Sequence, residues 1–359
     1  MENYIFSNSK IEKGFYSIFL CGVKYRKNID DKRFNLKQKL NSLDVKNISI
    51  ILEENFTFAS KDNRFLSYDD IFMRNLKDIE NLTAVFSDKV IIIHESISTA
   101  AELGMFAMNE WIAQKLCILI PDEYSVEENK ITSFLKLAFF RENNNIDLIK
   151  FYPEVETWKI SENKMDFRTK FFNNKILDNL EQRLNDFLKK DRNEFITINF
   201  RNAPYKNQII NDSTVVSYFL DKDIVNINVS VEIIRAHIIS FFNIDSFRSE
   251  MRTIKSLYAH ITYIEQFYNE ILVNTIQELE GKHINGISVT CKENQLEFRK
   301  VIAYTLYLLQ AMEMIDITKS NGSDEVVCKM VIKVKFNKIC ENYRSLIKHK
   351  PNVVLGCNK

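Results

Sequence analysis

The stretch 89–107 reads KVIIIHESISTAAELGMFA and decides the fold of the N-terminal half. Its first part, Lys89–His94, is a short apolar run with the length and composition of a buried strand. Ser96, Ser98 and Thr99 can then cap a helix over 99–114. A buried strand that leads directly into a capped helix predicts one βα unit of a parallel sheet.

The same alternation extends on both sides of this stretch. Apolar runs predict further strands at 16–21, 48–52 and 115–121. Amphipathic stretches predict helices at 34–43 and 68–82. Continuous Val, Ile and Leu runs separated by helices are typical of a parallel sheet covered on both faces. We therefore expect an α/β domain over residues 14–155.

Composition and charge narrow the class of protein. With 7 Gly and 4 Pro in 359 residues, the chain favours long regular elements, and 45% hydrophobic residues suffice for two cores. The 49 Lys and Arg balance 48 Asp and Glu, so no overall field attracts nucleic acid or membrane. No apolar stretch reaches the length of a signal peptide or a membrane span, so we expect a cytoplasmic protein with no membrane contact. Six cysteines without CxxC and five histidines without HxxxH disfavour a disulfide scaffold and a metal site.

The C-terminal half has a different pattern. An apolar stripe at i, i+4 spacing predicts one long helix over 168–190. This helix belongs to a helical connector that we expect over 156–211. Residues that favour turns predict a boundary at 202–212. Helical patterns follow at 213–220, 229–242, 251–280 and 293–314, and strand-like runs at 315–318 and 326–335. A helix followed by a two-stranded ribbon is the winged-helix order, so we expect a mainly helical, winged-helix-like domain over 212–350.

Two loops at predicted strand ends carry the candidate site. In an open parallel sheet, ligands bind outside the carboxyl ends of the strands, where helix N-termini converge. Cys21-Gly22 follows the first strand, and the glycine lets backbone amides approach a ligand. In the second loop, hydroxyls at Ser96, Ser98 and Thr99 suit phosphate or ribose oxygens, and Glu102 lies about one turn inside the helix. Its neighbours are apolar, which favours a carboxylate held over the strand ends; dipole compensation is the alternative reading.

At these positions the chain resembles the nucleoside 2-deoxyribosyltransferase-like effectors of bacterial retrons. The resemblance covers about residues 14–140 and rests on these motifs in order: Gly14-Phe-Tyr, Ile18-Phe-Leu-Cys-Gly22, Leu66-Ser-Tyr-Asp-Asp-Ile71, Asp88, Glu95-Ser96, Ala101-Glu-Leu-Gly-Met-Phe106, Lys115-Leu-Cys-Ile118 and Ser133-Phe134. It implies an N-terminal domain that cleaves an N-glycosidic bond. It also implies a C-terminal winged helix that associates with a reverse transcriptase and its RNA–DNA hybrid, in an oligomeric complex. The family usually has Gly-Ser or Gly-Thr before the glutamate, where this chain has Ser98-Thr99.

The chemistry of this bond assigns roles to the candidate residues. Positive charge develops at C1′ as the base departs, so an anion beneath C1′ is required. Glu102 is the candidate, as nucleophile or oxocarbenium stabiliser. Asp69 or Asp70 is a candidate to orient the ribose hydroxyls or handle a proton, with a helix N-terminal pair as the alternative. Ser96 is a candidate to bind the sugar or Glu102, and Tyr25 to stack on a base.

A local basic excess marks the C-terminal half. Residues 326–359 hold eight Lys and Arg against Glu341 alone. Lys329, Lys333 and Lys335 alternate as they would along one ribbon face, and together with Arg299 and Lys300 they are candidates to bind nucleic-acid phosphate. A solvated charged face is the alternative.

Three functions compete at this point. The first is an N-glycosidase that consumes NAD or a related nucleotide as its substrate, needs no cofactor, and acts as the toxic arm of phage defence. The second is a non-catalytic nucleotide-sensing domain joined to a DNA-binding winged helix. The third is a metabolic deoxyribosyltransferase, which would not need a further C-terminal half that ends in a basic patch. Glu102 separates the first two, because a pure sensor has little use for a buried carboxylate facing a ribose.

Overall fold

The computed structural model describes residues 3–23, 31–55, 73, 75–121, 146–151, 159–161, 164–165, 170–172, 175–203, 205, 210, 212–293, 297–319 and 328–350. The described residues between 15 and 192 form one compact unit, and those of 3–14 and 193–350 form the other. Each unit contains a five-stranded sheet. The chain therefore divides between 192 and 193, whereas the sequence pattern places the boundary at 202–212. Among the described residues, no helix is both long and apolar enough to cross a membrane.

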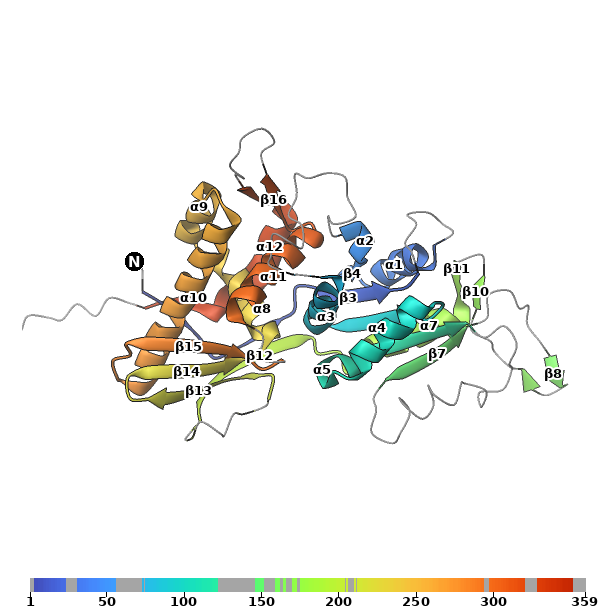
Figure 1. Cartoon of the computed structure of the whole chain (residues 1–359), viewed down its shortest axis with the longest axis horizontal. Coiled ribbons are helices and arrows are strands. Elements are labelled where there is room, and N and C mark those ends of the chain that lie inside the picture. The colour runs from blue at the N-terminus through green and yellow to red at the C-terminus, as the bar shows by residue number, and fades with distance from the viewer. Residues whose placement is uncertain are drawn as a thin grey trace, which may run out of the picture. The chain divides into compact units, whose positions relative to one another are not determined.

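The sheet of the first unit is parallel throughout (Figure 1). Its strands, in spatial order, are β4 (Asn47–Ile50), β3 (Tyr16–Cys21), β5 (Lys89–Ile93), β6 (Leu116–Pro121) and β7 (Asp147–Phe151). The expected α/β class and parallel sheet are confirmed. The residues of β3 and β5 are all buried, as continuous apolar runs predict for strands covered on both faces.

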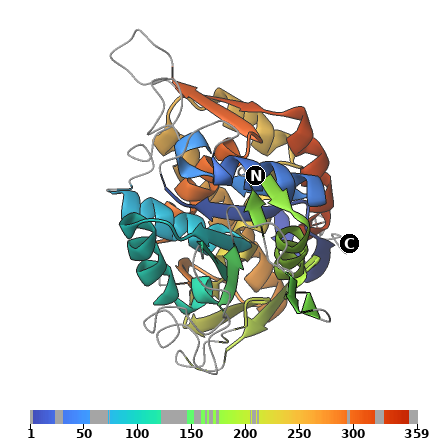
Figure 2. The same cartoon turned by 90° about the vertical axis from the view of Figure 1, so that its right-hand side faces the viewer.

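Helices cover both faces of this sheet (Figures 1 and 2). On one face, α1 (Lys32–Leu43) and α7 (Asp178–Lys189) bury leucines against Ile18, Ile91 and Ile149. On the other face lie α3 (Leu76–Phe86), α4 (Ile97–Ala107) and α5 (Glu110–Ala113), and the ring of Phe106 in α4 packs 6.2 Å from that of Phe19. A short helix, α2 (Leu52–Asn55), follows β4.

The long helix expected over 168–190 is wrong in its first half. The hairpin strands β10 (Lys170–Phe172) and β11 (Lys175–Leu177) precede α7, with Phe172 opposite Lys175. Phe171, Phe172 and Ile176 are aromatic or β-branched residues, which favour strands, and this local preference outweighs the i, i+4 pattern. The helix itself packs on the parallel sheet through Leu180, Leu184 and Leu188.

The second unit contains a mixed sheet that the helical reading missed. In spatial order its strands are β15 (Gly286–Cys291), β14 (Ile224–Val229), β13 (Val215–Asp221), β12 (Phe195–Asn202) and β2 (Ser9–Glu12). The helix expected at 213–220 is therefore wrong. Val215, Val216 and Tyr218 are β-branched or aromatic residues, which fit a strand buried in the sheet.

Helices in this unit follow the expected pattern more closely. They are α8 (Val231–Phe241), α9 (Asp245–Thr253), α10 (Leu257–Glu280), α11 (Phe298–Ala311) and α12 (Val334–Asn342). The ribbon expected after α11 is confirmed as the antiparallel pair β16 (Ile315–Lys319) and β17 (Cys328–Ile332). Because a five-stranded sheet accompanies them, the unit is mixed α/β and not mainly helical, and the winged helix stays a prediction.

The N-terminal residues belong to this second unit. Strand β1 (Tyr4–Phe6) pairs with β18 (Ile347–His349), and β2 pairs with β12. Phe6 is 3% exposed, and its ring stacks 3.7 Å from the ring of His237. Two distant parts of the chain therefore build one core.

Candidate active site at the strand ends

A cavity of about 320 Å³ opens at the carboxyl ends of β3, β4 and β5. Gly22 follows β3, Glu53 lies in α2 after β4, and Ser96 follows β5, and all three line the cavity. Because β3 lies between β4 and β5, this is the point where the strand order reverses, where open α/β sheets bind ligands. The predicted location of the site is therefore matched by a cavity.

Glu102 lines this cavity from the second turn of α4. Its Oε2 atom is buried and has no hydrogen-bond partner among the described residues. Burial raises the pKa of the carboxyl to about 8, the nearby Glu80 adds to the rise, and the positive charge of Arg33 opposes it. A buried carboxyl oxygen without a hydrogen-bond partner lowers the stability of the fold. Such groups, with shifted pKa values, are typical of functional sites.

Three charged residues that sequence reasoning missed share the cavity with Glu102. Arg33 of α1 is 4% exposed and donates two hydrogen bonds of 3.0 Å to the carboxylate of Glu53. Glu80 of α3 has a pKa raised to about 7 by burial and by Glu53. The three lie on separate helices, so no local spacing in the sequence signals that they converge. In the part of the chain that the structure describes, no group of His, Cys, Asp or Glu is arranged to hold a metal ion.

The predicted hydroxyls have separate roles. Ser96 and Thr99 form a reciprocal capping box at the start of α4, with Ser96 Oγ 3.2 Å from the Thr99 amide nitrogen. Thr99 is fully buried, so its hydroxyl serves the cap. Ser96 and Ser98 line the cavity. The capping prediction is confirmed, and substrate contact by Ser96 and Ser98 stays a prediction.

Gly22 and Cys21 lie as predicted beside the cavity, with different consequences. A Cβ atom at Gly22 would lie 3.0 Å from Cδ of Arg33, so the glycine makes room for the arginine side chain. Cys21 is buried, and burial and then Glu102 raise the pKa of its thiol, which disfavours a reactive thiolate. Tyr25, Asp69 and Asp70 lie outside the described residues.

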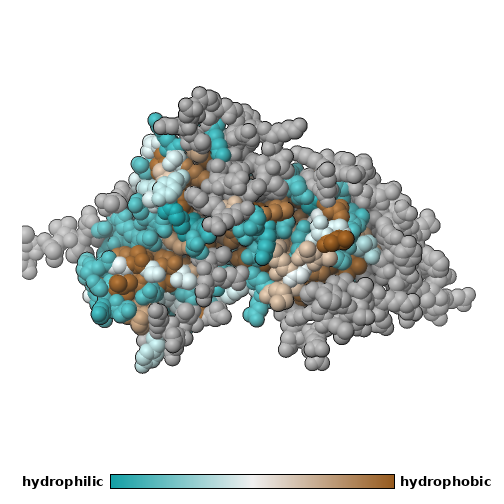
Figure 3. Space-filling view, viewed as in Figure 1, coloured by the Kyte–Doolittle hydropathy of each residue, from teal (hydrophilic) through white to brown (hydrophobic). Residues whose placement is uncertain are grey.

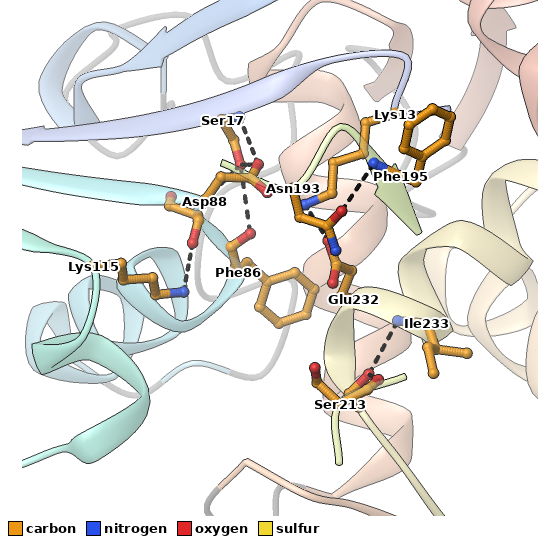
Figure 4. A network of polar contacts seen from close by, with 12 residues as sticks. Lys13, Ser17, Phe86, Asp88, Lys115, Asn193, Phe195, Ser213, Glu232 and Ile233 are labelled. Carbon is orange, nitrogen blue, oxygen red and sulfur yellow. Dashed lines mark hydrogen bonds and ion pairs between the residues drawn. The ribbon is translucent and has the colours of Figure 1, made fainter. Parts of the chain in front are cut away.

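Asp88 and Lys115, which belong to the motifs of the resemblance, lie at the amino ends of the parallel strands, opposite the cavity (Figure 4). Asp88, just before β5, accepts hydrogen bonds from the amide and hydroxyl of Ser17 at 2.8 and 3.0 Å. The Lys115 ammonium donates to the Val85 carbonyl oxygen at 2.7 Å. These contacts join the starts of β3, β5 and β6 to one another and to the end of α3, so their role is structural. Burial lowers the pKa of His94, which favours its neutral form.

Apolar surface lies over α4, beside polar surface (Figure 3). Ile97, at the first position of α4, is 92% exposed, and Met108, just beyond its end, is 88% exposed. Leu76 and Val23 line the cavity and are 48% and 41% exposed. The cavity therefore combines an acidic interior with apolar walls.

The basic candidates do not form one ribbon face. Strand β17 ends at Ile332, so of these three lysines only Lys329 lies on it. Lys333 occupies the position just before α12, and Lys335 lies within α12. The alternation predicted along the ribbon is therefore wrong, because the chain turns into a helix after Ile332.

Four of these cations have an acidic neighbour. The pairs are Arg299 with Glu265 at 2.6 Å, Lys300 with Glu297 at 3.0 Å, Lys333 with Asp316, and Lys335 with Glu313 at 3.5 Å. Most of these pairs are at least partly exposed and add little stability. Lys329 projects outward from the ribbon between the buried Cys328 and Met330.

Comparison with known proteins gives one clear match. A family model described as STM3845 retron effector protein matches residues 30–317, which is most of the chain. No curated protein matches the chain significantly.

Proposed function

The chain belongs to the STM3845 retron effector protein family, and we propose that it is a toxic effector whose strand-end cavity cleaves the N-glycosidic bond of NAD or a related nucleotide. The observation that carries this proposal is Glu102, with a buried carboxyl oxygen that has no partner among the described residues and that faces a cavity at the sheet's switch point. A carboxylate in such a place can stabilise the charge that develops at C1′.

The charge of the cavity supports a substrate that is cationic at its reacting end. Among the described residues, three glutamates, Glu53, Glu80 and Glu102, line it together with one guanidinium, which Glu53 already engages. The pyridinium ring of NAD is a cation and leaves as neutral nicotinamide, so the leaving group needs no proton from the protein. The apolar side chains of Leu52 and Leu76 offer surface for a flat ring.

The protonation of Glu102 fits this substrate. With a pKa of about 8, the carboxyl is mostly protonated at pH 7 in the empty cavity. A bound cation lowers the pKa of a nearby carboxyl. The substrate therefore generates the carboxylate that its own cleavage requires.

The C-terminal unit is proposed to hold the restraining partner, a reverse transcriptase with its RNA–DNA hybrid. Its exposed lysines support contact with phosphates, which gives affinity without reading the base sequence. Pairing with carboxylates at Lys333 and Lys335 makes Lys329 the strongest remaining candidate on the ribbon.

Base release tests this function. Purified protein is incubated separately with NAD and with deoxynucleotides, and free base is separated chromatographically. We expect nicotinamide and ADP-ribose from NAD. Binding of NAD without release of any base from either class would instead favour the nucleotide-sensing function.

A further inference from the structure

Glu80 lies in the middle of α3 and lines the same cavity as Glu102. We propose that Glu80 is the second catalytic carboxyl of this site, the base that takes a proton from the water that attacks C1′. This inference rests on the proposed function of the cavity.

The placement of the two carboxyls carries the argument. Helices α3 and α4 pack together on one face of the parallel sheet, and each directs one glutamate to the cavity. Glu102 comes from the helix that begins at the carboxyl end of β5, whereas Glu80 comes from the preceding helix. Two carboxyls that approach one cavity from two elements can contact a substrate at different points, as glycoside cleavage requires.

The charged neighbours leave Glu80 available for proton transfer. The guanidinium of Arg33, which lines the cavity, donates two hydrogen bonds of 3.0 Å to Glu53. Within the described part of the chain, no hydrogen bond or ion pair engages the carboxyl of Glu80. Burial and Glu53 raise its pKa to about 7, which suits a base that works near neutral pH. Among the described residues that line the cavity, the other titratable or charged groups are Glu53, Glu102, Arg33 and the buried Cys21 thiol.

The reaction step then balances. The C1′–N bond of a cationic glycoside breaks, and its electron pair stays on the ring nitrogen, so the base leaves neutral. Water forms the new C1′–O bond and passes one proton to the carboxylate of Glu80. Glu102 remains ionised and faces the positive charge at C1′. Deprotonation of Glu80 by solvent restores the site.

Three variants test the role of Glu80. Glu80→Gln keeps the shape and removes the base, Glu80→Ala opens room for an added nucleophile, and Asp78→Asn changes an acid on the same helix that does not line the cavity. We expect Glu80→Gln to lower the rate of nicotinamide release from NAD by about 10²- to 10⁴-fold. Asp78→Asn should stay within about twofold of wild type.

Chemical rescue separates catalysis from positioning. Azide attacks C1′ without losing a proton, so sodium azide should restore nicotinamide release by Glu80→Ala and give a glycosyl azide detectable by mass spectrometry. A loss of rate that azide does not restore, in variants whose thermal unfolding matches wild type, would assign Glu80 to positioning and overturn the inference. Near wild-type release by Glu80→Gln would overturn it as well. If the wild-type protein releases no base, the proposed function fails; if wild type and Glu80→Gln release base equally, only this inference fails.

Discussion

Arg33 and Glu53 form a two-pronged ion pair in which each terminal nitrogen of the guanidinium lies 3.0 Å from one carboxylate oxygen. Arg33 also donates to the carbonyl oxygen of Val23. Charge-assisted, bidentate pairs of this kind are strong and fix geometry. In the same cavity, burial raises the pKa of Glu80 to about 7 and that of Glu102 to about 8, and the charge of Glu53 adds to both rises.

Gly22→Ala should disturb this pair. The added Cβ lies 3.0 Å from Cδ and 3.2 Å from Nε of Arg33, so the arginine must shift. We expect a loss of about 1–3 kcal/mol in the free energy of unfolding, measured by urea titration, together with slower base release. Gly104→Ala is the matched control, because its Cβ meets nothing within 4 Å and a helical Gly→Ala change should stabilise by about 0.5–1 kcal/mol. Equal effects of the two substitutions would contradict the account of Gly22.

Glu102 should make stability depend on pH. Its pKa rises from 4.5 to about 8 on folding, so the folded state binds the proton more tightly. The stabilisation from this proton is complete below pH 4.5 and is lost as the pH rises through about 8. Glu102→Gln cannot ionise, so its free energy of unfolding relative to wild type should increase between pH 5 and pH 9, by on the order of 4 kcal/mol. Urea titrations at several pH values measure this, and a flat difference for Glu102→Gln would mean that its carboxyl is not perturbed.

Phe6→Ala should destabilise the C-terminal unit, although Phe6 lies near the start of the chain. The ring is 3% exposed and stacks on His237, and its amide donates to Thr275 Oγ1 at 2.8 Å. Loss of a buried phenyl ring costs about 3–5 kcal/mol. Amide hydrogen exchange should quicken in α8 and α10. Leu279→Ala, at a position 49% exposed, should cost less than about 1 kcal/mol; similar costs at both sites would refute the shared core.

Lys329→Ala should weaken binding of the nucleic-acid partner and reduce its dependence on salt. Each lost phosphate contact lowers the slope of log K against log salt by about one unit. Lys335→Ala should change the slope less, because Glu313 lies 3.5 Å from its ammonium group. Binding isotherms of labelled RNA–DNA hybrid at several salt concentrations measure both slopes, and an unchanged slope for Lys329→Ala would show that this face is only solvated.

The parallel sheet and the position of Glu102 were predictable because they depend on local patterns. Only a few neighbouring residues are needed to predict the strand at Lys89–Ile93 and the helix cap at Ser96. The Val215–Asp221 strand was not predictable in this way, because it is stabilised by neighbours distant in the chain and its short apolar pattern also fits a helix.

The remaining parts of the site depend on tertiary convergence. Arg33, Glu53 and Glu80 come from three helices and meet only when the sheet brings α1, α2 and α3 to one edge. Likewise, the pairing of β2 with β12 joins residues almost two hundred positions apart, as in Ile11 with Ile196. No spacing rule along the chain encodes such contacts.

The role of Glu102 is tested most directly by measuring nicotinamide release from NAD by wild type and by Glu102→Gln in parallel. Circular dichroism verifies the fold of both proteins. Loss of an anion that stabilises transition-state charge costs about 10²- to 10³-fold or more in rate. We predict that wild type releases nicotinamide and that Glu102→Gln falls by at least this factor, while Glu110→Gln matches wild type. Release by folded Glu102→Gln at a rate close to that of wild type would show that Glu102 does not carry the chemistry.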